Sequence, residues 1–488
     1  MFCHNILGRA RCQRAFPRVL FSATNTMETL PLYRVAELAE TEIVRGPRDI
    51  MIDRVGTDSR TIKPGELFVA LQGETFNAHN FLEQAAKAGA AGAIVSENPP
   101  PNLPTDFAIL RASDTLLAYQ NLAGNYRKTL SLKVLAITGS NGKTSTKDFA
   151  ASILGRAFRV TKTEGNFNNH VGLPRTILEA TADHQFAVWE LGMNHPGEIA
   201  ALARIASADA AIITNVGIAH IEFMGSREAI AQEKGTLAEA IEPSGFVVLN
   251  AEDDFSASIA NRTRARVIFA GIEKGTIRVT DVQQTPGACE FTMVEGAHRC
   301  RAQLPAPGLH MVQNAMLAVA AGRTFGVSLE ECAAGLTSAP LTKARLQIRE
   351  IHGVQFIDDS YNANPDSMKA ALRTLMELDA DGKRVAVLGR MLELGTESER
   401  GHREVGEAAA MLGIDHLISI GNDTIALAAE EAGLENSAIA QDAGDAAEML
   451  NEIVEPGDLV LIKGSRSSRT ELVLEEFAKL QPVGGSIR

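Results

Sequence analysis

The chain has 488 residues, which at ordinary domain sizes corresponds to about three domains. Hydrophobic residues make up 45% of the sequence and charged residues 22%, so each domain can bury a core, and disordered and fibrous classes are excluded. The formal net charge of -13 disfavours nucleic acid as a main partner, because it repels phosphate backbones. No apolar run approaches the roughly 20 residues that a bilayer span needs, so we expect no membrane span.

Residues 1–26 form a basic segment that contains no Asp or Glu. Its basic residues are Arg9, Arg11, Arg14 and Arg18, a composition typical of a transit peptide, but Met27 follows directly and opens an acid-containing sequence. We therefore expect residues 1–26 to be an over-long start or a disordered tail, outside the fold.

The five cysteines are scattered without the paired spacing of a zinc site. They are Cys3, Cys12, Cys289, Cys300 and Cys332. This pattern favours free thiols in a reducing environment and hence a cytoplasmic protein.

Strand and helix patterns divide the chain into three α/β units. The first, in residues 27–111, has a strand at 65–73, a helix at 81–89 and a strand at 92–96. In the second, residues 112–340, strands are expected at 134–138, 186–191, 210–215 and 246–250, with helices between them, which predicts a mostly parallel sheet. In the third, residues 341–488, strands at 354–358, 384–388, 416–420 and 458–463 with a helix at 366–378 predict a Rossmann-like, doubly wound domain.

The strongest local signal is the loop Gly139-Ser-Asn-Gly-Lys-Thr-Ser145, between an apolar strand and a helical run from Lys147 onward. Backbone N–H groups of such a loop point at phosphate oxygens, while Lys143 would neutralise the β- and γ-phosphates and Thr144 would reach Mg²⁺. The loop is shorter than the common P-loop, because Ile137 stands where that form has its first glycine. It predicts a nucleotide site; the alternative is a tight turn with an exposed lysine.

Two further strands end in polar side chains. Glu190 closes one strand and offers a hard oxygen suited to Mg²⁺, and His220 follows the next strand. Because ligands of open parallel sheets gather at the carboxyl ends of the strands, both can face the nucleotide. His220 is a second metal ligand or a hydrogen-bonded core histidine.

Three polar loops are further candidates for ligand binding. The loop at 163–170 (TEGNFNNH) contains Asn168 and Asn169 and suits a polar ligand or an ordinary turn. The loop at 358–365 (DDSYNANP) concentrates acids, amides and an aromatic between a strand and a helix, which is more typical of a site than of a structural device. The loop at 463–469 (KGSRSSR) could bind a carboxylate or phosphate, or be a solvated basic loop.

Together these strings resemble the Mur ligase family of ATP-dependent peptidoglycan precursor ligases, over about residues 28–470. The P-loop, the Glu-Leu-Gly at 190–192, the segment 215–220, Lys234 and the string GLHMVQNA at 308–315 carry the resemblance. The strings at 358–368 (DDSYNANPDSM) and 388–395 (LGRMLELG), with His402, resemble the branch that adds D-alanyl-D-alanine to UDP-N-acetylmuramoyl-tripeptide. One departure is Met311, where the family usually has Asn after the histidine, whereas Asn314 remains to serve the nucleotide.

The resemblance implies amide synthesis through an acyl phosphate, with ATP and two Mg²⁺ ions. Separately, we expect a monomer. The catalytic residues it implies are Lys143, Glu190, His220, Lys234 and Arg345. The metal ligands it implies are Thr144, Glu190, His220 and Lys234. For the nucleotide it implies Gly139, Ser140, Asn141, Gly142, Lys143, Thr144, Ser145, Asn314, Arg345 and Asp359. For the UDP-sugar it implies Asp58, Ser59, Arg60, Gln72 and Gly73, and the polar loops add Asn168, Asn169, Tyr361, Asn362 and Asn364 as substrate contacts.

Lys234 has two interpretations. By itself it looks like a solvent-facing lysine on a helix, whereas the resemblance implies a lysine carbamylated by CO₂ that binds a second Mg²⁺. A carbamate supplies two hard oxygens without another acidic residue, and it forms from the neutral amine, which burial and a nearby cation would favour by lowering the lysine pKa.

Three other functions remain open: a sister ligase that adds diaminopimelate or lysine, a folylpolyglutamate synthase-like ligase, and a P-loop switch. The string DDSYNANP weakens the first, and the domain that precedes the P-loop weakens the second. A switch needs no ligatable carboxylate, so phosphate release that depends on both substrates would exclude it.

Overall fold

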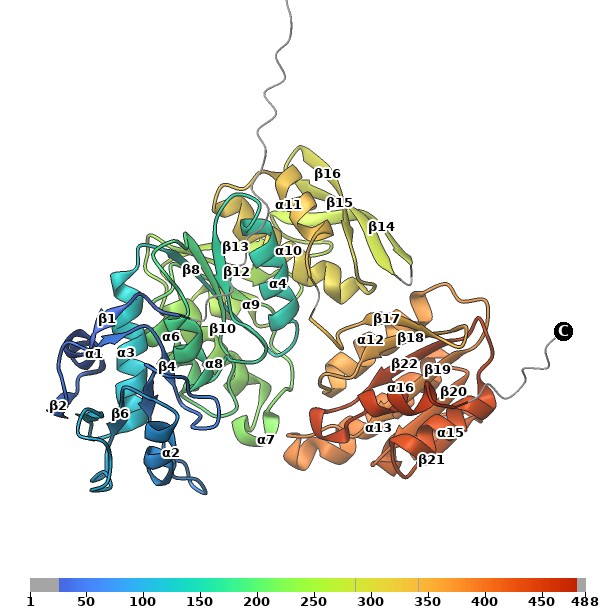
Figure 1. The fold of residues 1–488 in the computed structure, drawn as a ribbon. Helices are drawn as coiled ribbons and strands as arrows, with labels where there is room; N and C mark the ends of the chain where they lie inside the picture. Colours follow the sequence, from blue (N-terminus) through green and yellow to red (C-terminus); the bar gives the residue numbers. More distant parts are fainter. Residues whose placement is uncertain (1–25, 286, 341, 481–488) are drawn as a thin grey trace, which may run out of the picture.

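The computed structural model describes residues 26–285, 287–340 and 342–480, which are built around three sheets that follow one another along the chain (Figure 1). The segment expected to be an over-long start or a tail lies outside the described residues, except for Thr26.

The first sheet has five strands in the order β2-β7-β6-β5-β4. Its strands are β2 (Glu42–Arg45), β4 (Val55–Gly56), β5 (Leu67–Val69), β6 (Gly92–Val95) and β7 (Ala108–Arg111). All neighbouring pairs are parallel except the antiparallel pair β2 and β7. The strand expected at 65–73 is confined to β5, because Gly65, with φ +85°, makes the turn before it and the chain leaves the sheet before Gln72.

Short elements complete this N-terminal part: the strand pair β1 (Leu30–Pro31) and β3 (Met51–Ile52), and the helices α1 (Leu32–Ala39), η1 (Ala78–Phe81) and α2 (Leu82–Lys87). A long helix, α3 (Thr115–Thr129), follows and is capped by Asp114, whose carboxylate accepts from two backbone N–H groups. Apolar side chains of α1, α3 and the central sheet belong to one continuous core, so α3 packs the first sheet onto the central one.

The central sheet has nine strands in the order β16-β15-β14-β13-β12-β11-β8-β10-β9. Its parallel strands are β8 (Lys133–Thr138), β9 (Val160–Lys162), β10 (Phe186–Glu190), β11 (Ala210–Ile213), β12 (Phe246–Asn250) and β13 (Arg266–Ala270). Strands β8, β10, β11 and β12 are runs of apolar residues buried on both faces, as expected for parallel strands covered by helices. The chain winds to one side of β8 through β9 and β10 and then to the other side through β11, so a topological switch point lies at the end of β8.

A three-stranded antiparallel extension, which the sequence patterns did not indicate, continues this sheet: β14 (Ile277–Thr285), β15 (Ala288–Glu295) and β16 (His298–Leu304). The helices of the central part are α4 (Lys143–Leu154), α5 (Gly172–Leu178), α6 (Glu198–Ala206), α7 (Ile221–Met224), α8 (Arg227–Glu239), α9 (Ser256–Ala260), α10 (Leu309–Thr324) and α11 (Leu329–Thr337).

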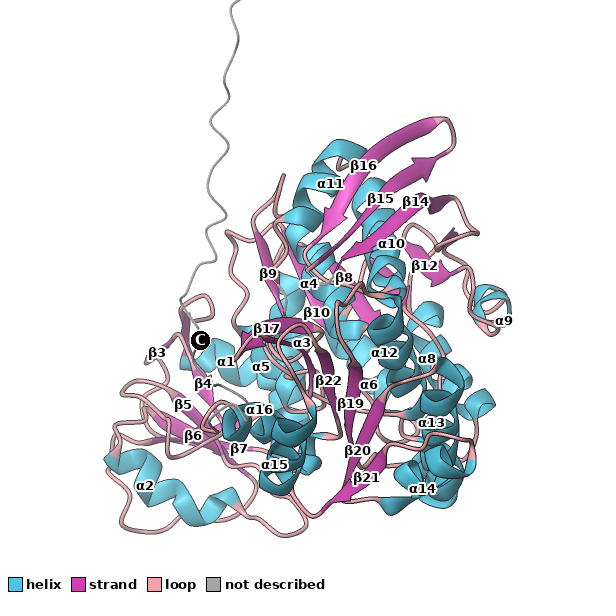
Figure 2. Ribbon diagram, turned by 90° about the vertical axis from the view of Figure 1, so that its right-hand side faces the viewer, coloured by secondary structure: helices cyan, strands magenta, loops and turns pink. Residues whose placement is uncertain are grey.

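The third sheet has six strands in the order β17-β18-β22-β19-β20-β21. They are β17 (Gln347–Ile351), β18 (Val354–Asp359), β19 (Arg384–Gly389), β20 (His416–Ile420), β21 (Ser437–Ala440) and β22 (Leu459–Lys463), and only β17 is antiparallel to its neighbour. The helices are α12 (Pro365–Glu377), η2 (Gly395–Glu397), α13 (Ser398–Leu412), α14 (Asp423–Glu431), α15 (Ala443–Ile453), η3 (Arg466–Ser468) and α16 (Glu471–Phe477). Figure 2 shows α13 and α14 on one side of this sheet and α15 and α16 on the other, which is the doubly wound arrangement predicted.

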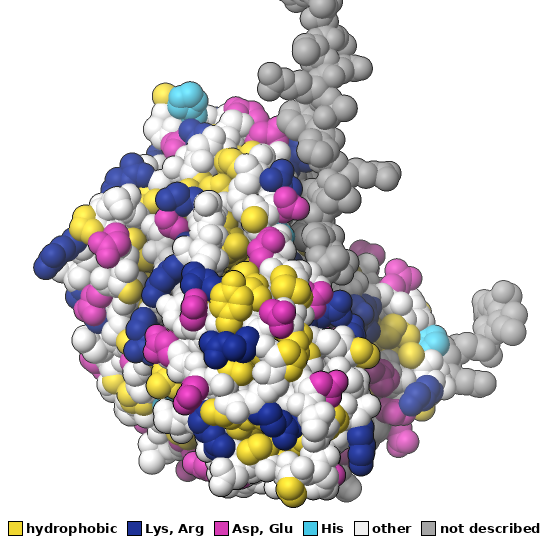
Figure 3. Space-filling view, turned by 60° about the vertical axis from the view of Figure 1, so that its left-hand side comes forward, with side chains coloured by type: hydrophobic (Ala, Val, Ile, Leu, Met, Phe, Trp, Pro, Cys, Tyr) yellow, Lys and Arg dark blue, Asp and Glu magenta, His cyan; other side chains and the backbone are white. Residues whose placement is uncertain are grey.

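The predicted fold class, α/β with mostly parallel sheets in the central and C-terminal parts, is confirmed. Among the helices of the described residues, none is both long enough and apolar enough to cross a membrane. On the face shown in Figure 3, basic and acidic side chains are both scattered, with hydrophobic side chains between them.

Candidate active site

A cleft of about 1000 Å³ lies where the carboxyl ends of the central parallel strands face the C-terminal domain. The P-loop, the loops after β10 and β11, and the first turn of α10 line it from the central domain, and the loops after β18 and β22 line it from the C-terminal domain. The switch point of the central sheet and the strand ends of both domains therefore meet at one place.

The P-loop connects β8 directly to α4, which begins at Lys143 rather than near Lys147 as the sequence pattern indicated. The reason is Gly142, which has φ +79° and brings the chain into helical geometry at the next residue. A Cβ at this glycine would stand 2.3 Å from Oδ1 of Asn314, so the loop and α10 pack too closely for any side chain. This packing brings Asn314 beside the P-loop.

Lys143 turns back over its own loop, and its Nζ donates to the carbonyl oxygens of Gly139 at 2.8 Å and Ser140 at 3.4 Å. Burial lowers the pKa of Lys143, and the nearby Arg345 guanidinium lowers it further, against the opposing charge of Glu190. The amine is thus held by carbonyl groups that a phosphate can replace.

A polar cluster surrounds Glu190 at the end of β10. One carboxylate oxygen accepts from the Thr144 hydroxyl at 2.9 Å, and the other accepts from Nδ2 of Asn168 at 2.8 Å. Arg345 donates to the same Thr144 oxygen at 3.2 Å, and its guanidinium carbon lies 4.3 Å from the ring centre of Tyr361. Glu190 and Arg345 thus contact Thr144 directly, while Asn168 and Tyr361 join the cluster through Glu190 and Arg345.

The donors of this cluster fit Mg²⁺, because the Glu190 carboxylate and the Thr144 hydroxyl are hard oxygens next to a phosphate-binding loop. Within the described part of the chain, no group of three or more His, Cys, Asp and Glu side chains could hold a metal alone. Mg²⁺ is usually bound by one or two protein oxygens together with phosphates and waters, and the Glu190 carboxylate and Thr144 hydroxyl are two such oxygens.

His220 is paired with a residue that the sequence did not indicate. Its Nδ1 lies 2.5 Å from the carboxylate of Glu393, which belongs to the loop after β19 in the C-terminal domain. Hydrogen bonding to His220 lowers the pKa of Glu393. His220 lines the cleft, but in this structure it contacts the C-terminal domain rather than Glu190.

Lys234 is 1% exposed on α8, so its interpretation as a solvent-facing lysine is wrong. Burial lowers its pKa well below the ordinary lysine value, and the charge of Lys143 lowers it further. Within the described residues Lys234 has no hydrogen bond or ion pair, although the neighbouring Glu233 caps α6 by accepting from Gly197 and Ile199. A buried amine without a partner is favoured in its neutral form.

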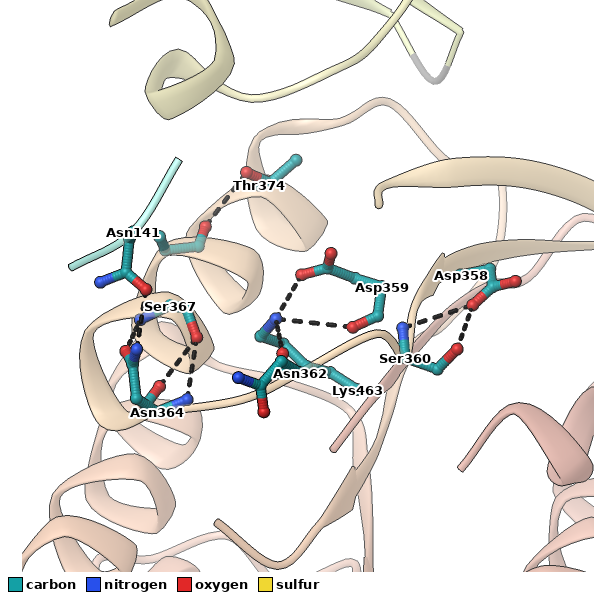
Figure 4. A network of polar contacts seen from close by, with 10 residues as sticks. Asn141, Asp358, Asp359, Ser360, Asn362, Asn364, Ser367, Thr374 and Lys463 are labelled. Carbon is teal, nitrogen blue, oxygen red and sulfur yellow. Dashed lines mark hydrogen bonds and ion pairs between the residues drawn. The ribbon is translucent and has the colours of Figure 1, made fainter. Parts of the chain in front are cut away.

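The loop after β18 meets the loop after β22 (Figure 4). Nζ of Lys463 lies 2.5 Å from the Asp359 carboxylate and donates to the backbone oxygen of Asn362 at 2.9 Å. The side-chain amide of Asn364 instead donates to Oδ1 of Asn141 in the P-loop, at 2.7 Å. Residues expected to contact substrate are therefore partly engaged with the protein itself.

The two amides of the loop after β9 differ in their partners. Asn168 binds Glu190, whereas Oδ1 of Asn169 accepts from the backbone N–H groups of Val171 and Gly172, which favours a turn role for part of this loop. Both line the cleft, as does the buried Ser145.

The five residues expected to hold the UDP-sugar lie in the N-terminal part and do not line this cleft. Asp58 and Arg60 form a 2.7 Å ion pair, and hydrogen bonds from Arg60 lower the pKa of Asp58 to about 2. The Ser59 hydroxyl donates to Gln84 at 3.3 Å, and Gln72 and Gly73 lie in a turn that Asn77 closes.

Sequence reasoning missed Glu393 and Asp366, which reach the central domain from the C-terminal domain. Both belong to the strings at 358–368 and 388–395 that carry the resemblance, but neither string shows which of its side chains crosses to another domain.

Three consecutive segments of the chain match Mur ligase domains. Residues 51–124 match the Mur ligase family catalytic domain, residues 137–322 the Mur ligase middle domain, and residues 344–466 the glutamate ligase domain of Mur ligases.

Relatives match along most of their length. A UDP-N-acetylmuramoyl-tripeptide--D-alanyl-D-alanine ligase of Bacillus subtilis (strain 168) is 38% identical over 432 residues, which cover 88% of this chain and 93% of the relative. Among solved structures, MurF from Acinetobacter baumannii has a TM-score of 0.87 at 34% identity, covering 93% of this chain and 100% of that one. MurF ligase from Thermotoga maritima in complex with ADP has a TM-score of 0.79 at 29% identity, covering 87% of this chain and 97% of that one.

Proposed function

Because this chain belongs to the Mur ligase family, we propose that it joins D-alanyl-D-alanine to UDP-N-acetylmuramoyl-tripeptide in an ATP-dependent reaction of peptidoglycan synthesis. The products are UDP-N-acetylmuramoyl-pentapeptide, ADP and phosphate. The observation that carries this function is the match to a UDP-N-acetylmuramoyl-tripeptide--D-alanyl-D-alanine ligase over 93% of the relative's length, with the phosphate loop and the DDSYNANP loop meeting in one cleft.

The reaction is amide-bond formation in two steps. First, a carboxylate oxygen of the tripeptide attacks the γ-phosphorus of ATP, and the bond to the ADP oxygen breaks. Second, the dipeptide amine attacks the acyl carbon, phosphate leaves, and the amine gives up a proton. The charge that moves in the first step is neutralised by Lys143 of the P-loop and by Arg345, which donates to Thr144, so catalysis is mainly positioning and electrostatic stabilisation.

The P-loop residues 139–145 would hold the phosphates, and Asn314 and Asp359 would hold the rest of the nucleotide from α10 and the loop after β18. Thr144, Glu190 and His220 would hold Mg²⁺, which when bound neutralises phosphate oxygens. For His220 to become a ligand, its contact with Glu393 must open or be shared.

Lys234 would become a carbamate and bind a second Mg²⁺. Its burial, its missing partner within the described residues and its lowered pKa support this role, because CO₂ adds to the neutral amine. Lys234→Ala should be inactive and partly rescued by millimolar short carboxylic acids, whereas Lys234→Arg should be inactive without rescue. Full activity of Lys234→Ala would contradict the assignment.

The substrates would lie on either side of the nucleotide. Asp58, Ser59, Arg60, Gln72 and Gly73 would hold the UDP-sugar on the N-terminal domain, and Asn168, Asn169, Tyr361 and Asn362 would contact the acceptor peptide or the dipeptide. We assign residues 27–111, 112–340 and 341–488 to the three domains, a division supported by the three separate sheets.

We also propose that the enzyme is a monomer in the cytoplasm. Lys143, Glu190, His220 and Arg345 line one cleft within a single chain, and Cys289, Cys300 and Cys332 are free thiols, as expected in a reducing compartment.

The test of the function is a coupled assay of phosphate release. We expect release only when ATP, UDP-N-acetylmuramoyl-tripeptide and D-alanyl-D-alanine are all present, with pentapeptide as the product by mass spectrometry. Release with a UDP-dipeptide and diaminopimelate or lysine would instead identify a sister ligase. ATP hydrolysis that is indifferent to both substrates would identify a nucleotide switch.

A further inference from the structure

The first turn of α12 crosses from the C-terminal domain to the nucleotide loops of the central domain. Asn364, the N-cap of α12, donates from Nδ2 to Oδ1 of Asn141 at 2.7 Å (Figure 4). Two residues later, the Asp366 carboxylate accepts from the backbone N–H of Ile218 at 3.2 Å. One helix end thus contacts both the P-loop and the loop that carries His220.

The direction of the Asn364 side chain is fixed by its role as a cap. Its Oδ1 accepts from the backbone N–H of Ser367 at 2.9 Å, and the Ser367 hydroxyl returns a contact to the Asn364 backbone, which forms a capping box. With Oδ1 held by the helix, Nδ2 points away from it, and Figure 4 shows that it points at Asn141.

Asn141, the partner of Asn364, is also held in place by hydrogen bonds within the central domain. Its backbone N–H donates to Oδ1 of Asn215 at 2.9 Å, and its backbone oxygen accepts from Thr214 at 2.5 Å and from Nδ2 of Asn215 at 3.1 Å. The loop after β11, which contains Asn215, also approaches Asp366: a Cβ at Gly217 would stand 2.4 Å from the Asp366 carboxylate. The contact therefore joins two prearranged surfaces.

The loop that presents α12 is rigid for a separate reason. Lys463 binds both the Asp359 carboxylate and the backbone oxygen of Asn362, and Ser360 donates to Asp358 at 2.6 Å. A displacement of the C-terminal domain would therefore carry Asn364 and Asp366 with it, rather than bend the loop between β18 and α12.

We propose that Asn364 and Asp366 are positioning residues through which docking of the C-terminal domain sets the geometry of the P-loop for phosphoryl transfer. Asn364 then acts on the nucleotide site through Asn141, rather than by contacting a substrate as the sequence indicated. The inference rests on the proposed function, because the step it governs is transfer of the γ-phosphoryl group from ADP oxygen to the carboxylate oxygen. ATP would transfer its γ-phosphoryl group only while the C-terminal domain, which helps bind the dipeptide amine, is docked.

The decisive variant is Asn364→Ser. Serine caps helices about as well as asparagine, so α12 keeps its N-cap, but the shorter side chain has no amide to reach Asn141. We expect kcat for phosphate release to fall about five- to twentyfold, with the KM for the dipeptide within about twofold of wild type. The matched control is Asn422→Ser, the same change at the N-cap of α14, where the side chain accepts only from Thr424. The control should retain full kcat.

A double-mutant cycle with Asn141→Ala identifies the partner. If the two residues act as a pair, the double variant loses no more kcat than the worse single variant. Multiplied losses in kcat would overturn the proposal, and so would a raised dipeptide KM with intact kcat in Asn364→Ser, which would make Asn364 a substrate contact.

A measurement without substrates separates this inference from the proposed function. Small-angle scattering with a non-hydrolysable ATP analogue and Mg²⁺ should give a larger radius of gyration for Asn364→Ser than for wild type and for Asn422→Ser. If the wild type lacks ligase activity but the radii of gyration differ in this way, the proposed function fails, whereas the proposed coupling between domain docking and the P-loop stands. Equal radii of all three proteins would overturn the coupling.

Discussion

Replacing Lys234 by methionine should stabilise the protein while abolishing its activity. Methionine is similar in length and volume, and Lys234 is 1% exposed, so the apolar side chain can fill the same space. What disappears is a buried amine that has no hydrogen bond or ion pair among the described residues. A buried polar group without a partner costs about 1–3 kcal/mol, so the free energy of unfolding should rise by about that amount at pH 7.

The gain should depend on pH with a definite sign. Burial lowers the pKa of Lys234 in the folded state, so between that pKa and the unfolded value of about 10.4 the unfolded chain binds more protons. Wild-type stability should therefore rise with pH through this window, and the advantage of Lys234→Met should shrink as the pH approaches its upper end.

The assay is denaturant unfolding of the ligand-free protein in CO₂-free buffer, with the central domain followed by the fluorescence of Trp189, the single tryptophan. Lys274→Met, at an exposed lysine of the same domain, is the control and should change the free energy of unfolding by less than about 0.5 kcal/mol. A destabilised Lys234→Met, or a gain that grows with pH, would refute the argument that this amine is buried at a cost.

Three further changes test the site and the packing around it. Lys143→Ala should lower kcat more than tenfold with little change in the acceptor KM, because the lysine compensates charge that moves during phosphoryl transfer; steady-state kinetics measure both, and a retained kcat would contradict the role. Gly142→Ala should weaken binding of an ATP analogue at least tenfold by calorimetry, since it combines a φ of +79° with a clash against Asn314; unchanged affinity would show that the loop adapts. Tyr126→Phe should cost about 1–3 kcal/mol in thermal or denaturant unfolding, because its buried hydroxyl donates to Ala180 and accepts from Glu28; a neutral effect would mean that these groups find other partners.

Strands of the parallel sheets could be predicted from sequence because their physical signal is local. The runs at 246–250 and 416–420 are apolar and bounded by turns, and β12 and β20 have these limits. The P-loop was also identifiable, since its glycines and Lys-Thr pair act within seven consecutive residues.

The environment of Lys234 could not be predicted, because nothing within α8 shows that its charged residues face the protein. Glu233 and Lys234 are both buried, one capping a helix that lies 34 residues earlier and the other close to Lys143. The pairs His220–Glu393 and Asn141–Asn364 likewise depend on how two domains meet. Periodicity records which face of an element is apolar, but not which polar groups a distant element supplies.

The position of α3 has a consequence for how the acceptor is measured. Helix α3 packs against α1 and α6, and the Tyr126 hydroxyl donates to Ala180 and accepts from Glu28, so the N-terminal part is packed directly against the central domain. If the UDP group binds at the proposed loops of the N-terminal domain, its distance from the P-loop is set by the fold. The enzyme would then select its acceptor by length: only a peptide of the right length, held at one end by its UDP group, places its terminal carboxylate at the γ-phosphate.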